Sequence, residues 1–117
     1  MVSLKLIVIR TNKPEELTAF YTVLGLQFDY HKHGNSPYHY SAKIDEAIFE
    51  IYPLLKSQSE PDKTLRLGFS VVDFDAVIQA LKSQHVKFIS EPEDTDFGCL
   101  AIVEDLDGRK VEVYRRE

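Results

Sequence analysis

Two segments of the chain carry apolar residues at positions i, i+3, i+4 and i+7, the stripe of an amphipathic helix. The first stripe is Leu17, Phe20, Tyr21 and Leu24, and the second is Phe74, Val77, Ile78 and Leu81. Asn12 is predicted to cap the first helix, with Pro14 in its first turn and Gly25 at its end. Asp73 is predicted to cap the second.

Shorter apolar runs rich in β-branched and aromatic residues predict strands around these helices. In the first half they cover residues 4–10, 26–32, 38–44 and 47–52, and in the second half residues 65–72, 86–90, 99–104 and 110–115. Residues 54–63 are polar and contain proline, as in a linker. Asp105-Leu106-Asp107-Gly108 predicts a tight turn between the last two strands.

The order strand, helix, strand, strand, strand therefore occurs twice. Each copy has a glutamate in the middle of its last apolar strand, Glu50 in the first and Glu112 in the second. We predict an α+β fold of two tandem βαβββ units, about residues 3–53 and 64–116, with curved mixed sheets around a cavity, in a single domain of residues 1–117. Each unit is too small to bury its helix and sheet alone, so the units are expected to pair within the chain or across a dimer.

Composition excludes several classes of protein. The 117 residues have a formal net charge of −5 and show no basic stripe, so nucleic acid is not an expected partner. No apolar run approaches the roughly 20 residues that span a bilayer, and residues 1–11 do not resemble a secretion leader, so no membrane partner is expected. The single cysteine, Cys99, excludes an internal disulfide framework and suits the cytoplasm.

Two motifs carry a resemblance that covers nearly the whole chain. Residues 15–28, EELTAFYTVLGLQF, and residues 103–114, VEDLDGRKVEVY, resemble the first helix and final hairpin of the vicinal oxygen chelate superfamily. The segment HGNSPYHYSAKIDEAIFEIYP is similar to an uncharacterised bacterial branch of it. The superfamily includes glyoxalase I, extradiol dioxygenases and bleomycin-resistance proteins, so the resemblance implies the fold and leaves the function open.

The resemblance also implies where a metal would bind in this superfamily. Its metal-using members take two ligands, often histidines, from near the starts of the first strands and two glutamates from the last strands. The glutamates match Glu50 and Glu112, whereas the other positions fall at or next to Leu6 and on Arg66. Neither side chain donates a lone pair to a divalent metal, so the usual site is predicted to be missing.

Arg66, Gly68 and Ser70 alternate with apolar residues and are predicted to line the cavity. Arg66 either clamps an anionic ligand with its planar guanidinium or forms a salt bridge with Glu112, and the two roles are compatible. Glu50 and Glu112 are candidate partners of cations, with a catalytic base and a metal ligand as the second and third interpretations.

Three of the four histidines, His31, His33 and His39, lie within nine residues. The first two are interpreted as surface residues near a loop, although a metal site that combines them with Glu50 stays open. His39 is predicted to reach the cavity and to hydrogen-bond Glu50 or a ligand.

The predicted function is a small-molecule-binding protein without the usual metal, with Arg66, His39, Glu50, Glu112 and Ser70 around an anionic or aromatic ligand. The alternative is a metal-dependent lyase, isomerase or dioxygenase that uses Glu50, Glu112 and His39 with Zn, Ni or Fe. Whether the chain catalyses a reaction stays open at this point. A homodimer in the cytoplasm is expected.

Overall fold

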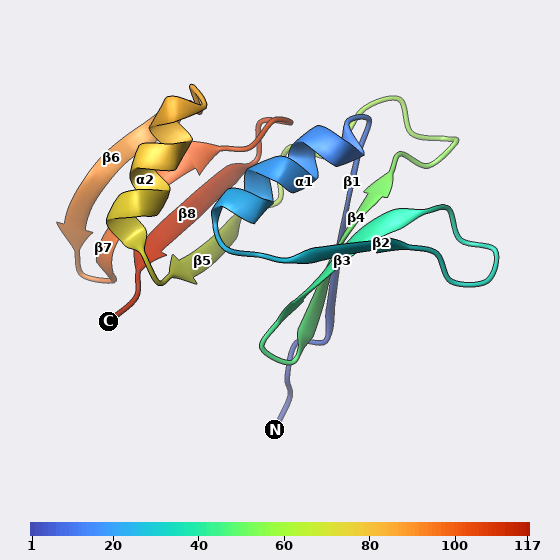
Figure 1. The fold of residues 1–117 in the computed structure, drawn as a ribbon, viewed down its shortest axis with the longest axis horizontal. Helices are drawn as coiled ribbons and strands as arrows, with labels where there is room; N and C mark the ends of the chain where they lie inside the picture. The colour runs from blue at the N-terminus through green and yellow to red at the C-terminus, as the bar shows by residue number, and fades with distance from the viewer. The chain divides into compact units, whose positions relative to one another are not determined.

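The computed structural model describes residues 1–117, which form two compact units, Met1–Asp62 (unit 1) and Lys63–Glu117 (unit 2). Figure 1 shows the chain in colours from blue to red. Unit 1 contains β1 (Leu6–Thr11), α1 (Pro14–Val23), β2 (Phe28–His31), β3 (His39–Ile44) and β4 (Ala47–Pro53). Unit 2 contains β5 (Leu67–Val71), α2 (Phe74–Ser83), β6 (Phe88–Thr95), β7 (Gly98–Glu104) and β8 (Lys110–Arg115). The predicted α+β fold of two tandem βαβββ units is confirmed.

Each unit forms one four-stranded mixed sheet with the same topology. The strand order is β1-β4-β3-β2 in unit 1 and β5-β8-β7-β6 in unit 2. The first and last strands of each unit pair in parallel, and the other neighbours pair antiparallel. The strands that carry Glu50 and Glu112, β4 and β8, are therefore inner strands of their sheets.

The core of unit 1 lies between α1 and one face of its sheet. Leu17 and Tyr21 of α1 are fully buried, and the ring of Tyr21 meets that of Phe49 of β4 edge-on, with 5.2 Å between centroids. Residues alternate between the two faces of a strand, so Glu50, which follows Phe49, belongs to the opposite face. We call the face of the unit 1 sheet that is opposite α1 its open face.

The core of unit 2 includes a buried ion network beside its apolar residues. Arg109 is 1% exposed, and its Nη1 donates to Asp105 Oδ2 at 3.2 Å and to Asp107 Oδ2 at 3.0 Å. Asp105 Oδ1 also accepts hydrogen bonds from the backbone N–H groups of Asp107 and Arg109. These bonds hold the predicted turn between β7 and β8 in place. The aspartates of the turn therefore stabilise it through hydrogen bonds and ion pairs, besides tolerating its backbone conformation.

The predicted cap of the first helix is wrong. Helix α1 is preceded by Lys13 as its N-cap, and no side chain caps it. Asn12 is displaced from that role because Pro14 already occupies the first helical position. The hydroxyl of Thr11 accepts the hydrogen bond of the Lys13 N–H at 3.0 Å instead. Asp73 is the N-cap residue of α2 as predicted, although its side chain makes no capping hydrogen bond.

Strand β6 runs to Thr95, five residues beyond its predicted end at Ser90. Pro92 made this segment resemble a loop, because proline lacks the N–H that a central strand requires. β6 is an edge strand, and its pairing with β7 shifts register between Phe88 and Ser90 and again between Ser90 and Glu93. An irregular edge strand accommodates a proline at such a place.

No helix of the structure has the length and apolar character required to cross a membrane.

Candidate metal centre

The hairpin of β2 and β3 sorts two residue types onto opposite faces of the unit 1 sheet. His31 pairs with His39 and Tyr30 with Tyr40, so each strand alternates histidine with tyrosine. Ser41 pairs with Asp29 on one side and with Glu50 on the other. Since paired residues share a face, His31, His39, Ser41 and Glu50 all lie on the open face.

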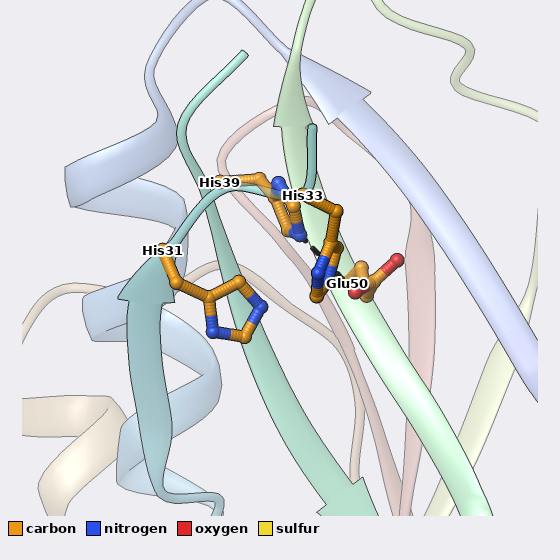
Figure 2. Close-up of side chains that lie close together, drawn as sticks. All are labelled: His31, His33, His39 and Glu50. Carbon is orange, nitrogen blue, oxygen red and sulfur yellow. Dashed lines mark ion pairs between the residues drawn. The ribbon is translucent and has the colours of Figure 1, made fainter. Parts of the chain in front are cut away.

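Four side chains of unit 1 meet on this face (Figure 2). They are His31 at the end of β2, His33 in the following loop, His39 at the start of β3 and Glu50 in the middle of β4. One nitrogen or oxygen atom of each lies within 4.8 Å of the corresponding atoms of the other three. His39 is fully buried and Glu50 is 8% exposed, while His33 is exposed. The group therefore combines two buried side chains, His39 and Glu50, with an exposed loop residue, His33.

The hydrogen bonding of His39 determines which of its ring nitrogens has a free lone pair. Its Nδ1 lies 3.0 Å from the carbonyl oxygen of Pro37, which only accepts, so Nδ1 carries the proton. In a neutral ring Nε2 then has an unshared lone pair. This atom lies 3.2 Å from Glu50 Oε2, yet the two do not have the geometry of a hydrogen bond. Nε2 is therefore a buried nitrogen with no hydrogen-bond partner beside a carboxylate oxygen, and a cation near both atoms, either a proton or a metal ion, would stabilise this arrangement.

His31 favours the metal ion over the proton. Its Nε2 is also buried without a hydrogen-bond partner, and a proton on His39 would leave this second nitrogen unsatisfied. Three imidazole nitrogens and one carboxylate oxygen form a set that suits Zn²⁺, Ni²⁺ or Fe²⁺. Tetrahedral Zn²⁺ holds its ligand atoms about 3.3 Å apart, so the largest separation, 4.8 Å, requires a small inward rotation of the side chains. The residues thus fit a transition-metal ion.

Neighbouring aromatic and cationic groups hold His39 in place. Its ring stacks on Tyr52 of β4 with 4.0 Å between centroids and 9° between planes. The guanidinium carbon of Arg10 lies 4.8 Å from the centroid of Tyr52, and Arg10 Nη1 donates to the Pro53 carbonyl at 3.1 Å. This stack, together with the bond to Pro37, fixes the plane of the His39 ring.

A pocket of about 550 Å³ lies beside the histidines on the open face. Its lining comes from unit 1 alone and includes His31, which belongs to the group of four. The polar residues of the lining are Gln27, Asp29, Ser41 and Lys43, and the apolar ones are Ala42 and Ile48. The pocket lies next to the candidate metal ligands, because Ser41 of its lining pairs directly with Glu50.

Strand register shows which residues of the first strands lie beside the two glutamates. Val8, not Leu6, pairs with Glu50, and Gly68, not Arg66, pairs with Glu112. Neither residue supplies a lone pair, so strands β1 and β5 offer no metal ligand at these positions. His33 is exposed, as its interpretation as a surface residue expects, whereas His31 is half-buried and its Nε2 is shielded from solvent. The spacing of the histidines indicated a possible site, and only the hairpin register shows that they meet.

In unit 2, Glu112 is held by neighbours. Arg66 Nη2 donates to Glu112 Oε2 at 2.8 Å, so the predicted salt bridge is present. The hydroxyl of Tyr114 donates to Glu112 Oε1 at 2.5 Å, and this hydrogen bond raises the pKa of Tyr114 above 10.0. Both carboxylate oxygens are therefore occupied. Ser70 pairs with Tyr114 and lines a pocket of about 490 Å³ with Phe97, Arg115 and other residues of unit 2.

Comparisons with known proteins agree on the fold. The family model "Glyoxalase/Bleomycin resistance protein/Dioxygenase superfamily" matches residues 3–113. Among solved structures, TnmS3, an antibiotic binding protein from Streptomyces sp. CB03234, has 18% identity and a TM-score of 0.77, with 100% of this chain and 98% of that chain covered. Oxidase ChaP-H2 has 16% identity and a TM-score of 0.76, with 100% and 95% covered. A glyoxalase/bleomycin resistance protein from the same Streptomyces has 20% identity and a TM-score of 0.73, with 97% and 100% covered. No curated protein sequence matches the chain significantly.

Proposed function

Because this chain belongs to the glyoxalase/bleomycin resistance protein/dioxygenase superfamily, we propose that it is a small-molecule-binding protein in which unit 1 holds a divalent transition-metal ion. The proposed ligands are His31, His33, His39 and Glu50. The observation that carries this proposal is the buried Nε2 of His39, which has no hydrogen-bond partner and lies 3.2 Å from Glu50 Oε2.

A divalent ion bound there would act as a Lewis acid toward an oxygen donor of the ligand. The residues of the chain position that ligand. Asp29, Ser41 and Lys43 line the pocket beside His31 and offer both hydrogen-bond donors and acceptors. Lys43 supplies a positive charge for a ligand carboxylate or enolate, and Ala42 and Ile48 supply apolar contact. The proposal includes catalysis of a lyase, isomerase or dioxygenase reaction at this site.

The test is the metal content of the purified protein by elemental mass spectrometry, after expression with added zinc, nickel or iron. We expect about one metal ion per chain. The variants His31→Ala, His39→Ala and Glu50→Gln should lose it, and each added metal should no longer raise their melting temperatures. His85→Ala is the matched control, because His85 is the remaining histidine and lies in unit 2. Absence of metal from the wild type, with no thermal shift from any of the three, would overturn the proposal.

The second candidate is binding of an anionic or aromatic ligand without metal. It is favoured by Arg66, whose side chain is 56% exposed while one of its nitrogens holds Glu112. A guanidinium has five N–H donors, so others are free to meet a carboxylate or phosphate. Arg66→Ala should then abolish binding of any ligand found, whereas chelators should change nothing. An activity that a chelator removes would exclude this candidate.

A homodimer remains part of the proposal. Leu4, Leu6 and Val8, at and before the edge strand β1, are 60%, 54% and 38% exposed. Apolar side chains gathered on an edge strand favour contact with a second copy. Sedimentation at micromolar concentration tests this, and a monomer throughout that range would contradict it. The cytoplasmic location stays a prediction.

A further inference from the structure

Three tyrosines lie on the face of the β2–β3 hairpin that is opposite the histidines. The rings of Tyr30 and Tyr38 stack with 5.1 Å between centroids, and those of Tyr30 and Tyr40 lie 4.6 Å apart. Tyr30 is 60% exposed and Tyr38 is 53% exposed. Large aromatic side chains normally bury most of their surface, so this cluster is not part of the core that α1 covers.

The tyrosines form one side of a second pocket of unit 1, with a volume of about 370 Å³. Its lining is Pro14, Glu15, Tyr30, Tyr38, Tyr40 and Pro53. Three of the six, Tyr30, Tyr40 and Pro53, come from the sheet, Tyr38 directly precedes β3, and Pro14 begins α1. The single formally charged side chain in the lining is the carboxylate of Glu15. The pocket is thus an aromatic wall with a negative charge at its edge.

Two further observations give the sign of the ligand's charge. The pKa of Tyr40 is raised first by burial and then by the nearby Glu15, Tyr30 and Glu16, so the carboxylates of Glu15 and Glu16 lie close enough to act on a group in the pocket. Lys32 Nζ lies 5.5 Å from the ring centroid of Tyr38, so one ring of the cluster already attracts an ammonium group of the chain itself. Anions are disfavoured here by Glu15 and Glu16.

We propose that the pocket between Tyr30, Tyr38, Tyr40 and Glu15 binds a small organic cation of the alkylammonium or quaternary ammonium class. The rings attract the cation through their quadrupole, and Glu15 supplies the opposite charge. The pocket lies on the other face of the hairpin from His31 and His39, so this site is independent of the proposed metal ion.

Choline is the probe, and its uncharged isostere, in which carbon replaces the nitrogen, is the comparison. Both are titrated into metal-free protein in the presence of a chelator, and backbone and tyrosine NMR signals are recorded. We expect saturable shifts at Tyr30, Tyr38 and Tyr40 with choline, and binding of the isostere about tenfold weaker. Tyr38→Ala and Glu15→Gln should each weaken choline binding about threefold or more.

Two variants serve as controls. Phe97→Ala in unit 2, where Phe97 is 82% exposed, removes an aromatic ring, and Glu60→Gln in the segment after β4 removes a carboxylate. Both should leave choline binding unchanged. Equal binding of choline and its isostere would overturn the proposal, because the pocket would then recognise only shape and apolar surface. Shifts that do not saturate, or an affinity for choline that is unchanged in Tyr38→Ala, would overturn it as well. Tyr38 and Glu15 are exposed, so neither variant is expected to unfold the protein.

Discussion

At the scale of single residues, the carboxylate of Glu112 meets a guanidinium and a phenol at once. Arg66 neutralises the carboxylate, and Tyr114 donates its hydroxyl hydrogen to it. Ionisation of Tyr114 would replace this donor by a second negative charge. The interaction therefore stabilises the neutral phenol, and the pKa of Tyr114 is raised above 10.0.

A pH titration tests this arrangement. The pKa of Tyr114 is higher in the folded than in the unfolded state, so the stability that it contributes is complete below about pH 10 and is lost as the pH rises through the folded pKa. We expect tyrosinate absorbance to show a tyrosine that ionises late in the wild type and earlier in Glu112→Gln. Tyr114→Phe assigns the signal, because Tyr40 also has a raised pKa. A late tyrosine that Tyr114→Phe removes but Glu112→Gln leaves unshifted would contradict the role of the carboxylate.

At the scale of elements, the two helices end in the same way with different residues. Gly25 follows the C-cap of α1 with φ +114°, and His85 follows the C-cap of α2 with φ +59°. Positive φ costs a residue with a side chain about 1 kcal/mol, and glycine avoids this cost. The first helix therefore has the favourable residue at this position and the second does not.

Reciprocal substitutions should reveal the difference. Gly25→Ala is expected to lower the free energy of unfolding by about 1 kcal/mol or more. The cause is the backbone conformation alone, since no atom lies within 4 Å of the added methyl group. His85→Gly is expected to stabilise the chain by about 0.5–1 kcal/mol. Urea denaturation measures both. A destabilised His85→Gly would mean that the imidazole makes a contact worth more than the strain of its backbone.

The elements also separate what the sequence could predict from what it could not. Hydrophobic periods of 3.6 and 2 residues indicate helices and strands locally, so the order and type of the elements in both units could be predicted from the sequence. The candidate metal site was not, because it depends on hairpin register. Histidine spacing alone does not place His31 opposite His39, and the seven residues 32–38 between these strands do not determine one register. Glu50 joins them only through the pairing of β3 with β4.

At the scale of the whole molecule, all four proposed metal ligands come from unit 1. The superfamily resemblance instead implies ligands from both units, including Glu112. The two ligand sets predict different distributions of stabilisation, because a metal protects the part of the chain whose folded state it binds.

Amide hydrogen exchange with and without zinc measures that distribution. We expect zinc at about 100 times its dissociation constant to slow exchange by about a hundredfold for amides of unit 1 that exchange when this unit alone opens, with amides of β5, β7 and β8 that exchange by local opening unchanged. Glu50→Gln should abolish the effect. Slower exchange around Glu112 would contradict a site confined to unit 1 and would favour the ligand set of the superfamily.

The alternation of histidine and tyrosine in β2 and β3 limits how this hairpin can vary. Deleting one residue inside either strand would turn its histidine to the face of the tyrosines and its tyrosine to the face of Glu50. Insertions in residues 34–36 change neither face, because that segment lies outside the pairing. In related sequences, length changes in this hairpin should therefore accumulate in the loop, and the lengths of the two strands should stay constant.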